Sequence, residues 1–116
     1  MRGALIVFLA LAVAGCLGPP CVNTVLEEKP SPDGERNIIV FSRDCGATTG
    51  FSTQGTILKR GQQLPNQAGN TFVIDHGGAK VAWESKGVLL VVFERGARIF
   101  KQEPAVAGVT VEYRSE

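Results

Sequence analysis

The residues that could carry nucleophilic or metal chemistry are few, because the 116-residue chain has 3 cysteines and 1 histidine. Cys45 and His76 form one candidate pair, in which an imidazole base activates a thiol nucleophile once the fold brings them together. A four-coordinate zinc site needs more soft ligands than one histidine without a C-x-x-C or H-x-x-x-H pair supplies. The sequence therefore offers a hydrolase using Cys45 and His76 as one hypothesis, and it predicts neither a metal site nor a cofactor.

The charge balance argues against binding to nucleic acid. The chain has 12 basic and 11 acidic residues, and one basic residue, Arg2, precedes the first apolar run. Without Arg2, the rest of the chain has equal numbers of basic and acidic residues. A neutral surface has no general electrostatic attraction to a phosphate backbone. We therefore expect no nucleic-acid partner.

The N-terminus has the order of a secretory signal. Arg2 is followed by the apolar run ALIVFLALAV at residues 4–13, which ends in small residues. Glycine and two prolines at residues 18–20 stop this run before the about 20 apolar residues that a membrane-spanning helix needs. We expect residues 1–15 to be a removable signal peptide rather than a buried helix of the fold.

Residues 13–16, Val-Ala-Gly-Cys, resemble the lipobox of bacterial lipoproteins. The resemblance implies that Cys16 receives a diacylglyceryl thioether and becomes the first mature residue, and two acyl chains suffice for stable anchoring. Leu17 follows, and by the same resemblance the absence of an aspartate there favours the outer membrane. The expected product is exported and faces the periplasm, with the membrane as a partner through its lipid. The alternative is ordinary cleavage after Ala14, which would release a soluble periplasmic protein.

The cysteine count agrees with export. Three cysteines leave one over in an oxidising compartment, but if Cys16 carries lipid, Cys21 and Cys45 remain as a pair. Disulfides persist in the periplasm and not in a reducing cytosol. A bridge between Cys21 and Cys45 would close a loop of about 25 residues, which is worth roughly 3 to 4 kcal/mol. We therefore expect a structural disulfide rather than a free reactive thiol.

The rest of the chain reads as short strands separated by turns. No segment after the signal has apolar residues at helical spacing over three turns. We expect residues 16–21 to be a lipidated tether and residues 22–116 to be a single all-β domain. About seven mostly antiparallel strands would form a rolled sheet, a sandwich or a small barrel. The segments are Val22 to Glu28, Asn37 to Arg43, Phe51 to Lys59, Thr71 to Asp75, Lys80 to Glu84, Val88 to Phe93, a short edge at Arg98 to Lys101, and a last strand through Val109, Val111 and Tyr113.

Side-chain alternation predicts which faces are buried. In the strand from Phe51 to Lys59, the face with Ser52, Gln54 and Thr56 is expected to be wet. The strand from Val88 to Phe93 is apolar on both faces and is expected to be the most buried. The predicted core is Ile39, Phe41, Ile57, Phe72, Ile74, Val81, Trp83, Leu90, Val92, Val109 and Val111.

The segment from Asp44 to Ser52 is the most unusual stretch, because it places a cysteine, glycines and hydroxyl residues between two strands. One interpretation is a recognition loop that is held by a disulfide. The other is purely structural, with glycines making the bend and threonines bonding to their own backbone. The candidate binding residues are Asp44, Gly46, Thr48, Thr49, Gly50 and Ser52.

Two resemblances lie in the body of the chain. Ser31-Pro32-Asp33-Gly34 resembles the opening of blades in periplasmic β-propellers, but one copy cannot close a propeller. The string SPDG at residues 31–34, the string RDCGATTGFST at residues 43–53 and the later Trp83 resemble a group of small exported bacterial proteins of unknown function. That resemblance implies a membrane-attached or periplasmic protein, and it brings no catalytic residues.

These observations favour a cell-envelope lipoprotein that is a non-enzymatic protein-binding module, such as an inhibitor or immunity-like protein. Its partner would be another protein of the envelope. The alternatives are a passive structural or assembly subunit of an envelope complex and the hydrolase that would use Cys45 and His76.

Overall fold

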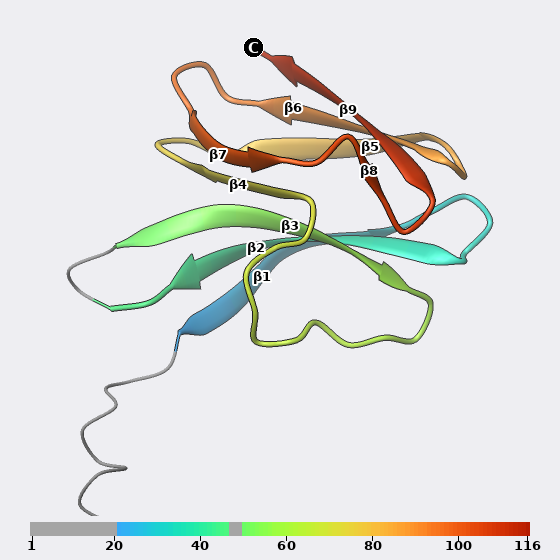
Figure 1. Ribbon diagram of the computed structural model, residues 1–116, viewed down its shortest axis with the longest axis horizontal. Helices are drawn as coiled ribbons and strands as arrows, with labels where there is room; N and C mark the ends of the chain where they lie inside the picture. The colour runs from blue at the N-terminus through green and yellow to red at the C-terminus, as the bar shows by residue number, and fades with distance from the viewer. Residues whose placement is uncertain (1–20, 47–49) are drawn as a thin grey trace, which may run out of the picture.

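The β-branched and aromatic runs form strands throughout the part of the chain that the computed structural model describes, residues 21–46 and 50–116 (Figure 1). The prediction of an all-β fold is confirmed, with nine strands in these residues where about seven were expected. The expected signal peptide and residues 16–20 of the tether lie outside the described residues, as do Thr48 and Thr49. The strands are β1 (Val22–Pro30), β2 (Arg36–Asp44), β3 (Phe51–Lys59), β4 (Phe72–Asp75), β5 (Ala79–Ser85), β6 (Val88–Phe93), β7 (Arg98–Gln102), β8 (Ala105–Val106) and β9 (Val109–Ser115).

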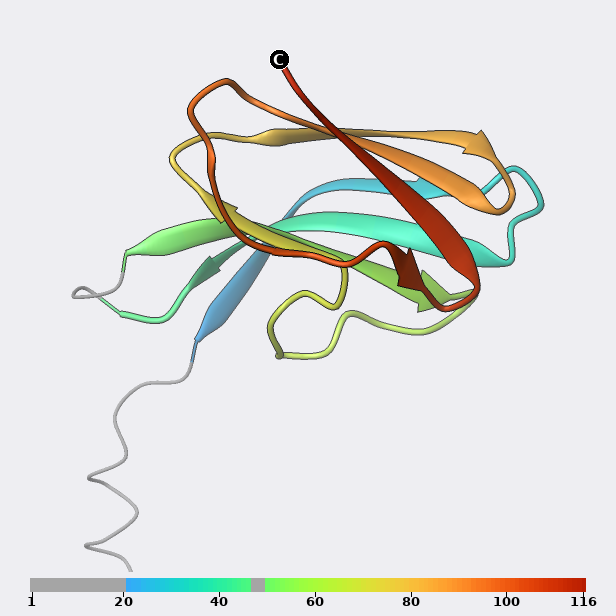
Figure 2. The same ribbon diagram turned by 45° about the horizontal axis from the view of Figure 1, so that its top comes forward.

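The strands form two open sheets that pack face to face, so the sandwich is the observed arrangement (Figure 2). The first sheet has the order β1-β2-β3-β4-β7, and the second has the order β5-β6-β9-β8. All pairs are antiparallel except β6 with β9, which is parallel. The largely antiparallel pairing is as predicted. The expected sequential order is interrupted where β7 joins β4 and where β9 joins β6.

The main core lies between the two sheets. β2, β3 and β4 contribute from one side, and β5, β6 and β9 contribute from the other. The aromatic rings of Phe72 and Phe93 meet edge to face across this space, with centroids 5.5 Å apart. The buried members are Ile38, Val40, Ile57, Phe72, Ile74, Val81, Leu89, Val91, Phe93, Val109 and Val111.

Part of the core prediction is wrong in β6. Leu89 and Val91 are fully buried, while Leu90 and Val92, which were expected in the core, are only half-buried. In a strand made of apolar residues alone, the sequence does not show which alternate side chains face the core. The pairing with the neighbouring strands determines this instead. Trp83 is also half-buried, and its ring packs against the edge of the core.

A second, smaller cluster lies on the outer face of the first sheet. Ile39, Phe41 and Leu58 are buried there under Leu64 of the connection between β3 and β4. This connection returns across the strands, because the backbone N–H of Gly69 donates to Gln54 Oε1 at 2.7 Å. The prediction that Gln54 and Thr56 face solvent is therefore wrong, since both are buried under this connection. Ile39 and Phe41 are buried as expected, but in this second cluster.

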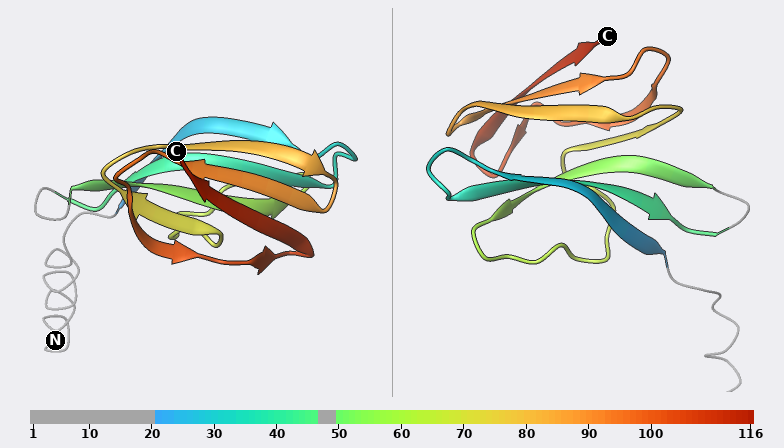
Figure 3. Two further views of the ribbon diagram at one scale, coloured as in Figure 1. Left: turned by 90° about the horizontal axis from the view of Figure 1, so that it is seen from above. Right: turned by 180° about the vertical axis from the view of Figure 1, so that it is seen from behind.

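The strands run between two ends of the sandwich, and different segments of the chain form each end (Figure 3). We call one the anchor end, made by residues 21–22, 44–46, 50–51, 76–78 and 94–97. The other is the turn end, made by residues 31–35, 86–87 and 107–108. Because β1 runs away from residue 21, Cys21 and the turn end lie at opposite ends of the sandwich. Within the described part of the chain, no helix is both long and apolar enough to cross a membrane.

Candidate functional site

The predicted disulfide is present and closes the anchor end. Cys21 and Cys45 are bonded, with their Cα atoms 4.0 Å apart. The next residues, Val22 and Asp44, are register partners of β1 and β2. The bridge therefore joins the residue that precedes β1 to the residue that follows β2, at the same end of the sheet.

The described part of the predicted binding loop is held by local hydrogen bonds. Asp44 Oδ1 accepts from the backbone N–H of Gly46 at 3.0 Å, and Gly50 N–H donates to the carbonyl of Gly46 at 3.1 Å. Gly46 and Gly50 have φ angles of 124° and 68°, which side chains other than glycine rarely adopt. Ser52 Oγ accepts from Gln54 Nε2 at 2.7 Å. The glycine bends are those that the structural interpretation of the loop expects, while its threonines, Thr48 and Thr49, lie outside the described residues.

Beside this loop, the antiparallel pairing of β4 with β7 places Asp75 opposite Arg98. The guanidinium donates to both carboxylate oxygens of Asp75, at 3.2 and 2.9 Å. The Arg98 hydrogen bond holds the pKa of Asp75 below its ordinary value, and the same pairing raises the pKa of Arg98. Arg98 also lies over the ring of Phe100, 5.2 Å from its centroid. The short edge strand predicted at Arg98 to Lys101 is thus real, and its arginine is paired.

The structure brings Cys45, Ser52, Asp75 and Arg98 to one cleft of about 440 Å³, and His76 to the adjoining cleft of about 490 Å³. The Cys45 sulfur is bonded to Cys21, so it has no thiol for the imidazole to activate. His76 Nε2 lies 3.7 Å from Asp75 Oδ1, and that carboxylate is already engaged by Arg98. In this state the proposed thiol–imidazole pair lacks its nucleophile.

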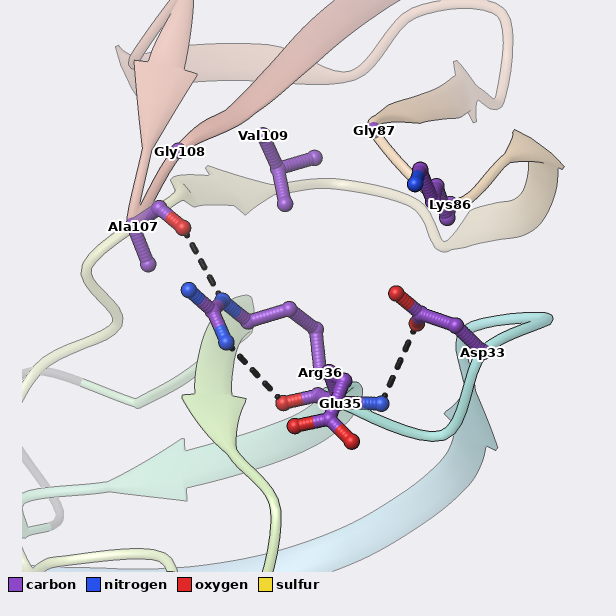
Figure 4. A pocket seen from close by; sticks show the side chains of 8 residues that line it. All are labelled: Asp33, Glu35, Arg36, Lys86, Gly87, Ala107, Gly108 and Val109. Carbon is purple, nitrogen blue, oxygen red and sulfur yellow. Dashed lines mark hydrogen bonds between the residues drawn. The ribbon is translucent and has the colours of Figure 1, made fainter.

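A different concave site lies at the turn end (Figure 4). Three connections from both sheets meet there: the β1–β2 turn, the β5–β6 turn and the β8–β9 turn. They enclose an open cleft of about 340 Å³, which Val109 lines together with charged side chains. The residues that line it are Asp33, Glu35, Arg36, Lys86, Gly87, Ala107, Gly108 and Val109.

The β1–β2 turn is held by its own side chains. Ser31 Oγ donates to Asp33 Oδ1 at 2.7 Å, and the same oxygen accepts from the backbone N–H of Glu35 at 3.1 Å. Gly34 has a φ of 74°, which the turn requires and glycine adopts without strain. The Ser31 hydroxyl, followed by the Glu35 N–H, keeps the pKa of Asp33 below its ordinary value. The Ser31 to Gly34 motif therefore builds a fixed turn with an ionised carboxylate.

Arg36 joins this turn to the other sheet. Its Nε donates to the carbonyl of Ala107 at 2.9 Å, and one terminal nitrogen donates to the Glu35 carbonyl at 3.1 Å (Figure 4). Lys86 projects from the β5–β6 turn, on the far side of the cleft from Ala107. Glu35 also lies 3.6 Å from the guanidinium of the exposed Arg60. The cleft thus presents carboxylates and cations on a fixed frame.

Sequence reasoning noticed the Ser31 to Gly34 turn but missed this cleft. Arg36 and Lys86 are 50 positions apart, and no local pattern relates them. Only the packing of one sheet on the other brings their turns together. Among the residues that the structure describes, no group of three or more histidine, cysteine or acidic side chains could hold a metal ion. No known protein family, curated protein or solved structure matches this chain.

Proposed function

We propose that the protein is a lipoprotein of the bacterial envelope, held by acyl chains on Cys16, that binds a partner protein with the cleft at its turn end. The anchoring rests on the signal-like N-terminus and the lipobox. It is supported by the pairing of Cys21 with Cys45, which leaves Cys16 as the one cysteine outside the bridge. Cys21 and the turn end lie at opposite ends of the sandwich, so the proposed attachment does not block the access of a periplasmic protein to the cleft.

The observation that carries the binding role is the fixed, mixed-charge cleft. Asp33 and Arg36 are held by hydrogen bonds within and between turns, so a partner does not have to order them. Ordered charges of both signs favour a complementary protein surface and give specificity to an interface. A small-molecule site is instead usually enclosed and mostly apolar. Binding by fixed turns suits an inhibitor or an immunity-like protein.

A crosslinking experiment in intact cells tests this proposal. A photoreactive amino acid replaces Lys86 at the cleft, or Glu112, which is exposed on β9 of the second sheet. We expect a discrete protein adduct from position 86 and none from position 112. In the position-86 protein, Glu35→Lys reverses a charge at the cleft, and Glu112→Lys makes the same change elsewhere. The first should reduce the adduct and the second should not; equal adducts from both positions would refute the cleft as a binding site.

The assembly-subunit alternative predicts a different result. A subunit of a large complex should remain in that complex after mild detergent extraction, whatever the charge at the cleft. Size-exclusion chromatography of the wild type and of Glu35→Lys separates the two functions. If both proteins elute in the same large complex, the cleft does not mediate the association.

A further inference from the structure

The largest exposed apolar side chain of the anchor end is Phe51, with 71% of its surface exposed. It lies in the same cross-strand row as Val22, because Asp44 of β2 pairs with both residues. Val22 is 59% exposed. This row is the last of the first sheet at the anchor end, so both side chains project where the strands stop. Singly exposed apolar residues are common, but these two share one end of the sheet.

The predicted tether restricts what this end can meet. Five residue steps separate Cys16 from Cys21, and a fully extended chain of that length reaches at most about 18 Å. Cys21 cannot swing away from the sheet, because the disulfide fixes it to Cys45 at the end of β2. Lipid on Cys16 therefore holds the row of Val22 and Phe51 close to the surface in which that lipid is inserted.

The charges at the anchor end are compatible with a headgroup layer. Arg43 and Arg98 line the same cleft as Phe51, and the exposed Arg95 belongs to the same end. The nearby carboxylates are Asp44, Asp75 and Glu94, of which Asp75 is paired with Arg98. Because cations and anions nearly balance, the attraction would come from the apolar side chains and not from net charge. Aromatic side chains are favoured at the level of the headgroups, where an apolar ring can leave water.

We propose that the anchor end rests on the phospholipid surface, with Phe51 and Val22 inserted at the boundary between headgroups and acyl chains. The inference rests on the proposed lipid anchor, and it adds an orientation that the anchor alone does not impose. A lipid with a flexible linker would let the domain tumble. A second contact at Phe51 holds the anchor end against the membrane and points the turn end away from it. The cleft at the turn end is then presented to the periplasm.

Fluorescence quenching on vesicles tests this contact. The acylated protein is reconstituted into phosphatidylethanolamine and phosphatidylglycerol vesicles that contain a lipid with a spin-label quencher near the top of the acyl chain. A fluorophore is attached to Arg95→Cys at the anchor end or to Lys86→Cys at the turn end. Both positions are exposed, and with Cys16 acylated and the other two cysteines bonded, each new thiol is the single reactive one. We expect loss of emission at position 95 and no change at position 86.

A matched pair of variants assigns the contact to Phe51. In the position-95 protein, Phe51→Asp should restore emission by letting the domain lift from the surface. Leu26→Asp removes another exposed apolar side chain, which is 58% exposed in the middle of β1, and it should leave the quenching unchanged. The proposal would be overturned by equal emission at positions 95 and 86. It would also be overturned if the quenching at position 95 were the same with and without Phe51→Asp. A purified protein partner that covers Phe51 and restores emission at position 95 would assign this end to that partner instead.

A second arm of the experiment distinguishes the absence of a natural lipid anchor from the absence of the surface contact. If mass spectrometry finds no acyl group on Cys16, the chain from Leu17 is attached through an N-terminal histidine tag to nickel-chelating lipids in the same vesicles. Quenching at position 95 is still expected, because the tag brings the anchor end to the lipid surface and Phe51 can then insert. Unquenched emission in both arms refutes the surface contact, while quenching only in this arm refutes the natural anchor and retains the contact.

Discussion

Removal of the disulfide should cost the domain a large share of its stability. The bond joins residues 24 positions apart, so it closes a loop of about 25 residues. The chain-entropy relation for that loop gives a loss of about 12 cal/mol/K in the unfolded chain, or about 3.5 kcal/mol at 25 °C. The net stability of a domain is typically about 5 to 15 kcal/mol. Cys21→Ser with Cys45→Ser should therefore leave the protein folded but much closer to its unfolding threshold.

Urea unfolding of the purified protein measures this loss. With a typical urea slope of about 1 to 3 kcal/mol per molar, the midpoint should fall by about 1.2 to 3.5 M in the double variant. The wild type with a reducing agent should match the double variant, because both lack the same bond. A Cys16→Ser protein is the control and should unfold like the wild type. A loss below about 1 kcal/mol would refute the reasoning, since it would mean that the unfolded chain is not constrained by this loop.

Three further outcomes follow from contacts inside the sandwich. Gly55→Ala places a Cβ 2.2 Å from a ring carbon of Phe72, so calorimetry should show destabilisation of about 1 to 3 kcal/mol or more. Trp83→Phe removes the 2.9 Å hydrogen bond from the indole to the Lys29 carbonyl, which joins the edges of the two sheets, and should cost about 1 kcal/mol in urea unfolding. Burial, followed by the charge of a nearby glutamate, raises the pKa of Tyr113 to about 12 from an ordinary value of 10.0. The folded state thus binds this proton more tightly, and the stability it contributes below pH 10 is lost as the pH rises from 10 to 12.

Each of these outcomes has its own control. Gly87→Ala adds a Cβ with no atom within 4 Å and should change stability little; an equal effect at both glycines would contradict the steric argument. For the indole, a Trp83→Phe protein as stable as the wild type would show that water replaces the bond. Tyr113 is the one tyrosine of the chain, so its ionisation is read directly from ultraviolet absorbance. A midpoint near pH 10 while the protein remains folded would contradict the burial of its hydroxyl.

Local patterns in the sequence predicted the strands well. The bounds of β3 and β6 agree residue for residue with the predicted segments, because glycines and charged residues mark their ends. β8 was missed, since two residues, Ala105 and Val106, are too few to show alternation. The buried face of β6 was assigned wrongly for the related reason that VLLVVF contains no polar residue. Its two neighbours, β5 through Val81 and β9 through Val111, select Leu89 and Val91 for the core.

The sites were less predictable than the strands. The disulfide followed from counting cysteines, and the fixed turn followed from the Ser31 to Gly34 motif. The cleft could not be predicted in this way, because it depends on the hydrogen bond from Arg36 to the carbonyl of Ala107, which lies 71 positions away in the chain. The burial of Gln54 was missed for the same reason, since the connection that covers it looks like an ordinary polar loop in the sequence. Long-range packing, and not local propensity, creates both features.

The central claim is that export delivers the chain to an oxidising space where Cys16 is acylated and the other two cysteines are joined. Intact-mass spectrometry of the membrane-extracted protein tests it most directly, with and without alkylation of thiols. The account predicts a chain that begins at Cys16, carries acyl groups and takes up no alkylating agent before reduction. A chain with intact Met1 and three alkylated cysteines would contradict it.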